Sequence, residues 1–386
     1  MPFSARQGFF KTTAAGTPAY PDWPTQANVS QYNTEVALYS GTRGTFTTNT
    51  FGKSYVSNSY RGSVRHPNGN VYFLPRAQTN IFEYDPSSNT ATQISVSGTG
   101  SNNYTGGALG RNGNIYLAPF SASDVLEFDP RTRTSRSITI TGGVSGSNKY
   151  NGAVTDKSGN VVMIPQNETE FIEVDCTVTP ATAKTKSFGV STSELGGAKY
   201  ISGTVHPNGN IYLAPLQSDS FMEIDPVNDA FSKFAIPSAS TGQVLAQGAV
   251  TGADGNIWMI PYNAGYHATL DPDTGTVTKP TIDGGLTNMA PANQGYIGGT
   301  AAPDGNIYYA PFNTGDIITF DPVTLTGTKI ASGVSGADRF VGAASDLANV
   351  YFVPNSAGKV GILPTGASGG TNANAYTLSS FVNSGH

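Results

Sequence analysis

The sequence predicts an all-β fold, a seven-bladed β-propeller with an irregular N-terminal arm, on three observations. A phrase of the form Gly-Asn-Ile-Tyr-x-x-Pro recurs in exact or looser copies, with its Asn at positions 70, 114, 160, 210, 256, 306 and 349. The copies follow one another after 44, 46, 50, 46, 50 and 43 residues, a period typical of propeller blades. No window shows the sustained periodicity and caps of a helix.

Each repeat unit contains turn signals for four short strands. In the second unit, small residues at 107–110 precede an Asn-Gly turn, and the β-rich run 115–119 follows. A loop then leads to an alternating segment at 125–128, the turn Asp129-Pro130 and a last alternating segment at 132–138. Four short strands in a unit of this length match a propeller blade. We expect the small residues on the innermost strand, where the blades converge.

The chain divides into an N-terminal arm at residues 1–58, which lacks the phrase, and a propeller at residues 59–386. A propeller has to close its ring, because an open sheet edge leaves backbone groups unpaired. Either residues 374–381 or a segment within residues 34–50 could complete the last blade. We favour closure by the N-terminal residues, so part of the arm is expected to close the ring.

Composition argues against several classes of function. The net charge is −5 and no basic run occurs, so nucleic-acid binding by phosphate neutralisation is not expected. No apolar stretch reaches the ~18 residues of a membrane span. Residues 1–16 lack the apolar core of a signal peptide, and the single cysteine, Cys176, permits no internal disulfide. We therefore expect synthesis in a cytoplasm without classical secretion.

The arm carries large aromatic residues in a Pro- and Gly-rich setting. Phe9, Phe10 and Trp23 lie outside the repeats, and such side chains rarely face water without a partner surface. Three interpretations stay open: the arm packs on the propeller, it anchors in another chain or a second copy, or it is disordered. These three aromatic residues are the candidate interaction residues.

The histidines show no pattern of a metal or catalytic site. His66 and His206 precede Pro-Asn-Gly-Asn in the same turn of two units that are distant around the ring, so we interpret them as turn residues. His267 is expected in a third strand, either buried or at a blade surface, and His386 belongs to the C-terminal tail. No His-x-x-x-His or Cys-His metal spacing occurs. We predict no metal ligand and no cofactor.

The carboxylates follow the repeat as well. Asp254 and Asp304 occupy turn positions where other units have Asn or Ser. A second position, two residues before the turn Asp, is acidic in four units and Thr in two later ones: Glu83, Glu127, Glu173, Glu223, Thr269 and Thr319. The ring of carboxylates is thus broken, and no Gly-x-Ser-x-Gly or phosphate-loop motif occurs. We predict a structural role for these residues and no catalytic residue.

One unit reads Asp-Gly-Asn-Ile-Trp at 254–258 and Leu-Asp-Pro-Asp-Thr-Gly at 270–275. In these motifs it resembles the blades of virginiamycin B lyase-like propellers, and the resemblance extends over the seven-unit array. Activity in that family depends on a metal-assisted His and Glu site in loops on one face. No residues here match that site, so the resemblance implies the fold and we expect no enzymatic activity.

The leader Ser-Ala-Arg-Gln-Gly-Phe-Phe at 4–10 and the Gly-, Thr- and Asn-rich composition look like structural proteins of tailed bacteriophages. This resemblance implies a non-enzymatic virion protein whose propeller decorates the particle or attaches it to host surface glycans. The arm would dock the disc to other proteins of the capsid or tail. The unequal loops at 142–150, 189–200 and 282–296 are the predicted ligand contacts.

Two other functions remain open from the sequence. One is a propeller enzyme of the lyase or hydrolase type, with a site on one face of the disc. The other is a carbohydrate-binding interaction propeller unrelated to a virus. A cluster of His and acidic residues above the axis would favour the enzyme, and glycan binding by the isolated disc would favour the interaction propeller.

Overall fold

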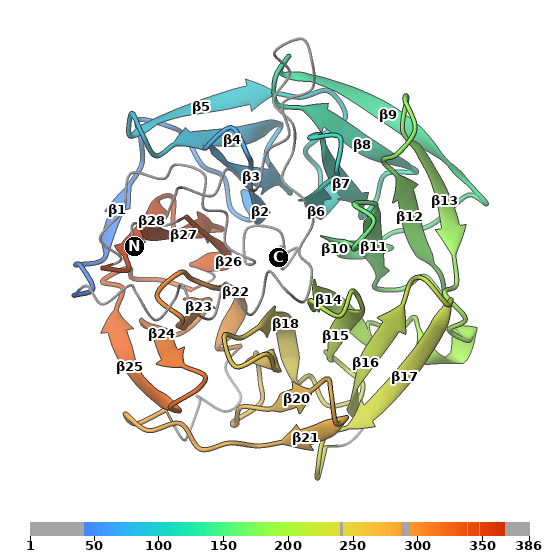
Figure 1. Ribbon diagram of the computed structural model, residues 1–386. Coiled ribbons are helices and arrows are strands. Elements are labelled where there is room, and N and C mark those ends of the chain that lie inside the picture. The colour runs from blue at the N-terminus through green and yellow to red at the C-terminus, as the bar shows by residue number, and fades with distance from the viewer. Residues whose placement is uncertain (1–41, 240–241, 287–293, 338, 347, 367–386) are drawn as a thin grey trace, which may run out of the picture.

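In the computed structural model of the chain, the described residues are 42–239, 242–286, 294–337, 339–346 and 348–366. They form a closed ring of seven blades around a central axis, with one strand of each blade lining the axis (Figure 1). Each blade is an antiparallel four-stranded sheet. Blades two and three appear as one eight-stranded sheet, because β9 and β13 pair in parallel where Ile140 lies opposite Ala183. The predicted seven-bladed propeller is confirmed.

The strands run from the axis outward in chain order. Blades one to three consist of β2 Tyr60–Arg65, β3 Val71–Pro75, β4 Asn80–Asp85, β5 Thr90–Ser95; β6 Tyr104–Leu109, β7 Ile115–Pro119, β8 Asp124–Asp129, β9 Thr134–Thr141; β10 Tyr150–Thr155, β11 Val161–Pro165, β12 Phe171–Asp175 and β13 Thr182–Lys186. Blades four to six consist of β14 Tyr200–Val205, β15 Ile211–Pro215, β16 Ser220–Asp225, β17 Ala230–Ala235; β18 Ala246–Thr251, β19 Ile257–Pro261, β20 Thr269–Asp271, β21 Thr276–Thr278; β22 Tyr296–Ala301, β23 Ile307–Pro311, β24 Asp316–Asp321 and β25 Thr326–Ala331. Blade seven contains β26 Phe340–Ser345, β27 Asn349–Pro354 and β28 Val360–Pro364.

The part of the recurring phrase after its Asn forms the second strand of every blade, and its position explains why these residues are largely apolar. In β7, Ile115 and Leu117 pack in the core shared with blade one, whereas Tyr116 and Ala118 pack in the core shared with blade three. Successive side chains of a strand point to opposite faces, and here a neighbouring blade covers both faces. The strand therefore shows no alternation of apolar and polar residues.

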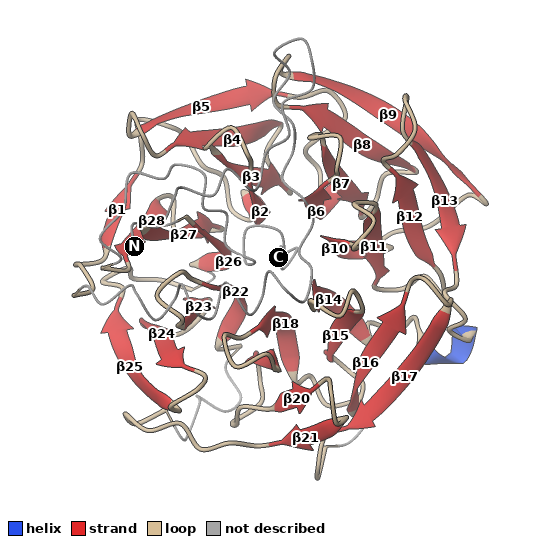
Figure 2. Ribbon diagram, viewed as in Figure 1, coloured by secondary structure: helices blue, strands red, loops and turns tan. Residues whose placement is uncertain are grey.

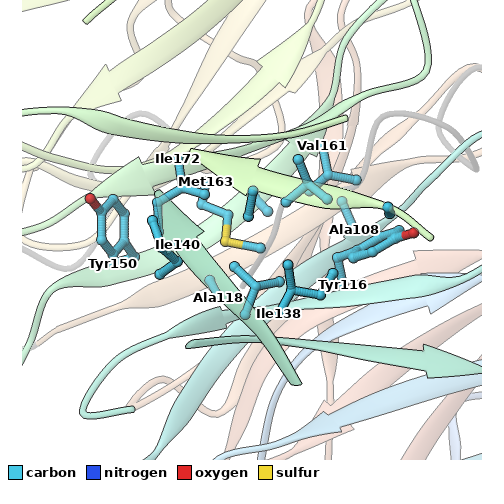
Figure 3. Close-up of a cluster of buried hydrophobic side chains, with 14 of the residues drawn as sticks. Ala108, Tyr116, Ala118, Ile138, Ile140, Tyr150, Val161, Met163 and Ile172 are labelled. Atoms are coloured by element: carbon cyan, nitrogen blue, oxygen red, sulfur yellow. The ribbon is translucent and has the colours of Figure 1, made fainter. Parts of the chain in front are cut away.

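The cores of the propeller lie between the blades. Figure 3 shows the one between blades two and three, which extends from Tyr150 past Ile140 and Met163 to Tyr116. The aromatic residue that opens the innermost strand is buried in every blade except blade five, whose strand opens with Ala246: Tyr60, Tyr104, Tyr150, Tyr200, Tyr296 and Phe340. Burial of these side chains removes apolar area from water at each blade contact, which is the main stabilising contribution.

The ring is closed by the N-terminal part of the chain. Strand β1, Thr47–Asn49, pairs antiparallel with β28, so that Thr48 lies opposite Gly361, and it supplies the outermost strand of blade seven. Phe46 adds side-chain packing, because its ring makes edge contacts with Phe340 and Phe352. Closure by residues within 34–50 is therefore confirmed. The alternative segment at 374–381 lies outside the described residues.

Strands account for nearly all of the regular structure (Figure 2). The described residues contain one helical turn, a 3₁₀ turn at Thr192–Glu194, in the connection between blades three and four. Within the same residues, no helix has the length and apolar character needed to cross a membrane.

Candidate functional site

Most blades hold a carboxylate near the start of the second strand, next to an aromatic side chain. In blade two, the Tyr116 hydroxyl donates to Glu127 Oε1 at 2.8 Å, and Asn114 Nδ2 donates to the same oxygen at 2.8 Å. Asn112 Nδ2 donates in turn to the Tyr116 hydroxyl oxygen at 2.7 Å. Blades one and four repeat these bonds around Glu83 and Glu223. The Glu on the third strand thus fixes the second strand and the turn before it.

In blades five to seven the carboxylate comes from the turn instead of the third strand. Asp304 accepts from the Tyr308 hydroxyl at 2.5 Å, and Asp346 accepts from the Tyr351 hydroxyl at 2.6 Å. Asp254 accepts from the Trp258 indole N–H at 3.1 Å. The third-strand position opposite the aromatic ring is then Thr269 in blade five and Thr319 in blade six. In these blades a turn Asp accepts the hydrogen bond that a third-strand Glu accepts in the earlier blades. Both are structural contacts, in agreement with the role predicted from sequence.

Blade three departs from both patterns, because Val162 replaces the aromatic residue of the second strand. Glu173 forms ion pairs with Lys184 and Lys186, each at 3.1 Å. Asp156 accepts from the backbone N–H groups of the turn and is 4% exposed. Burial raises the pKa of Asp156 to about 6, and the nearby Glu173 charge adds to this effect.

The two turn histidines serve the contact between neighbouring blades. His66 Nδ1 accepts from the Asn68 backbone N–H at 3.1 Å, so the ring is protonated at Nε2, which lies 3.0 Å from the Gly113 carbonyl oxygen of blade two. His206 Nδ1 accepts from the Asn208 N–H at 3.2 Å. Burial lowers the pKa of both rings, so both stay neutral near pH 7. Both lie in turns, as the sequence predicts.

His267 lies two residues before β20, Thr269–Asp271, and not within the third strand as expected. Blade five has a shorter third strand than most other blades, so its entry loop includes this residue. The ring is 1% exposed, stacks on Tyr309 and lies with Nδ1 3.3 Å from the Tyr309 hydroxyl. Burial lowers the pKa of His267 to about 4. It is a buried packing residue, one of the two interpretations left open above.

The cysteine of the disc is buried as well. Cys176 is 3% exposed, and burial raises the pKa of its thiol to about 12, so thiolate is scarce at neutral pH. Among the described residues, no group of three or more His, Cys, Asp and Glu side chains has the geometry to hold a metal ion. Phe9, Phe10, Trp23 and His386 lie outside the described residues.

A second set of residues lies at the axis, four of the seven are polar, and sequence reasoning did not find it. The set consists of the second residue of each innermost strand. At this position a β-bulge shifts the register, as between Tyr60 and Ser63 in β2. Around the ring these residues are Arg61, Thr105, Asn151, Ile201, Gln247, Ile297 and Val341. Arg61 Nη2 donates to Gln247 Oε1 at 2.9 Å, a bond between blades one and five across the axis. The positions repeat without a shared residue type, so no pattern marked them.

The axial residues lie at the face from which the chain enters each innermost strand. The unequal loops predicted as ligand contacts join the outermost strand of one blade to the innermost strand of the next, so they reach this same face. The loop at 142–149 and the connection that holds the 3₁₀ turn are of this kind. Residues 287–293 of the third loop lie outside the described residues. The axial set and these loops form the candidate functional site.

Comparison with solved structures supports the fold. The chain matches a catalytically inactive variant of virginiamycin B lyase from Staphylococcus aureus, crystallised with quinupristin, at a TM-score of 0.66 and 12% identity, over 83% of this chain and 98% of that one. A streptogramin B lyase structure matches at a TM-score of 0.65 and 14% identity, over 82% and 97% of the two chains. The β-propeller domain of Cps50 (Swd1) from Myceliophteria thermophila matches at 0.57 and 11%, over 82% and 98%.

The resemblance to virginiamycin B lyase-like propellers is therefore confirmed at the level of the fold. At these identities the matches show the propeller and nothing about chemistry. No protein-family model matches the chain. No curated protein matches its sequence.

Proposed function

We propose that this chain is a non-enzymatic virion protein of a tailed bacteriophage, whose propeller is displayed on the capsid or tail for decoration or host attachment. The non-enzymatic part of the proposal is supported by the structural contacts of acidic and histidine side chains in the disc. The carboxylates beside the second strands accept bonds from Tyr, Trp and Asn within their own blades. The three described histidines are buried at or between blades.

Residues 1–58 supply the docking part of the proposal. They carry Phe9, Phe10 and Trp23 in a leader that resembles those of tailed-phage structural proteins. The described end of this segment is already used by the disc, because Phe46 and β1 complete blade seven. The chain before residue 42 remains for contact with other virion proteins, and the disc is the part exposed to host glycans.

Deletion of residues 1–30 tests the docking. We expect the shortened chain to fold, because the deletion ends before the closing strand, and to be lost from assembled particles. The matched control is Val227→Ser, at a side chain 59% exposed on the disc, which should enter particles normally. Normal incorporation of the shortened chain would exclude docking through these residues.

A propeller enzyme is the second candidate, favoured by the fold shared with virginiamycin B lyase. Its test is incubation of the full chain with quinupristin, with and without divalent metal, followed by mass spectrometry of the antibiotic. A non-enzymatic chain leaves quinupristin intact. Metal-dependent conversion that is lost on substitution of a histidine would establish the enzyme instead.

A further inference from the structure

The axis of the ring carries a positive charge that no carboxylate of the innermost strands offsets. Arg61 lies on β2, and none of the seven innermost strands contains an Asp or Glu. The partner of its Nη2 is the neutral amide of Gln247, at 2.9 Å. A second guanidinium, that of Arg76, packs over the Phe120 ring on the same face. Burial and the charge of Arg76 lower the pKa of Arg61 to about 9, so it remains charged at neutral pH.

A half-buried arginine without a counter-ion is costly, because protein groups replace much of the water that would solvate it. The arginine side chain is nevertheless held in place by the bond to Gln247. Its Nε is buried and has no hydrogen-bond partner among the described residues. An anion bound beside Arg61 would accept a hydrogen bond from Nε and neutralise the charge of the guanidinium.

The innermost strands of blades two and three, β6 and β10, also contain a buried polar atom without a hydrogen-bond partner among the described residues. Within the part of the chain that the structure describes, Thr105, 0% exposed, leaves its Oγ1 without a partner, and Asn151, 3% exposed, leaves its Oδ1 without one. The Asn151 amide is oriented by Nδ2, which donates to Gln166 Oε1 at 3.0 Å. The three atoms occupy the same strand position in blades one, two and three. They offer two donors, Arg61 Nε and the Thr105 hydroxyl, and one acceptor, Asn151 Oδ1.

We propose that the axis of the propeller binds a hydroxylated carboxylate, whose carboxylate pairs with Arg61 and Thr105 and whose hydroxyl donates to Asn151. A planar carboxylate matches the guanidinium fork, and the hydroxyl satisfies the acceptor that a bare carboxylate leaves unpaired. Sugar acids and small hydroxy acids share this chemistry. The site goes beyond the display role proposed above and does not depend on a virion.

Calorimetric titration of the full chain tests the site with three probes: glycolate, acetate and glycolamide. We expect glycolate to bind more tightly than acetate, which lacks the hydroxyl, and glycolamide, which lacks the charge, to show no binding. Arg61→Gln should weaken glycolate binding by about tenfold or more, the usual effect of losing a charged hydrogen-bond partner. Asn151→Leu should remove the preference for glycolate over acetate. Arg131→Gln, at an exposed arginine on the rim, is the matched control and should bind as the parent does.

Absence of glycolate binding overturns the site, as does unchanged affinity in Arg61→Gln. If Arg61→Gln misfolds, Thr105→Val serves as the second variant and should also weaken binding.

Discussion

Asp156 shows at the scale of one residue how burial couples charge to stability. The backbone N–H groups of its turn hold the carboxyl inside blade three, where its pKa rises to about 6 from an ordinary value of 3.8. Between these two values the folded chain keeps the proton that the unfolded chain has lost. Stability therefore falls as pH rises through this window and stays lower above it.

Asp156→Asn removes this dependence and keeps the acceptor oxygen for the turn. We expect the variant to be more stable than the parent above pH 6, by roughly 3 kcal/mol, with the difference vanishing below about pH 4. Urea unfolding at pH 4 to 8 measures it. A difference that does not change with pH would contradict the buried, protonated carboxyl.

Asp129 is the matched control, because its surroundings lower the pKa of its carboxyl, whereas those of Asp156 raise it. Burial pushes its pKa up, but bonds from Arg131 and Thr132 outweigh burial and hold the pKa below the ordinary value. Asp129→Asn should therefore lower stability at neutral pH, and the loss should shrink as the pH falls.

At the scale of the blade, a carboxylate can be moved from the turn before the second strand to the third strand. This exchange tests whether the two positions support the aromatic side chain equally well. In blade six, Asp304 binds the Tyr308 hydroxyl, and Thr319 lies opposite Tyr308 where blade two has Glu127. Asp304→Asn should cost about 1–2 kcal/mol, because a buried hydroxyl loses its charged acceptor. Adding Thr319→Glu should recover most of this loss.

Chemical denaturation of both single variants and the double variant gives the coupling between the two positions. Thr319→Glu alone should be destabilising, because it places two carboxylates beside one hydroxyl. Strictly additive effects in the double variant would show that the two carboxylate positions are not interchangeable.

The elements of each blade follow closely from the sequence, and the contacts between blades do not. The phrase around Asn114 predicts β7, because a short apolar run between two turn signals has few other solutions. The relation between Asp304 and Thr319 was visible only as a broken ring of carboxylates. Arg61 and Gln247 are 186 residues apart, and a β-bulge turns both toward the axis. Pattern and propensity report neighbours within a strand or hairpin, so a bond across the ring leaves no local signal.

At the scale of the whole molecule, stability depends on how the ring closes. Phe46→Ala removes a ring packed against Phe340 and Phe352 beside the closing strand. We expect a loss of about 2 kcal/mol for this half-buried side chain, and a lower thermal midpoint for the disc. Val323→Ala, at a side chain 65% exposed in a turn of blade six, is the control and should change little. Unchanged stability of Phe46→Ala would mean that blade seven holds without the N-terminal segment.

The proposed place of the molecule is the surface of a tailed virus particle, where an arm docks a closed disc that performs no catalysis. Mass spectrometry of tailed particles, purified from the cells that produce this chain, tests that proposal most directly. The proposal predicts peptides of this chain in the particles at a level comparable with other structural proteins. Particles that lack these peptides, while the chain is abundant in the remaining lysate, would contradict it.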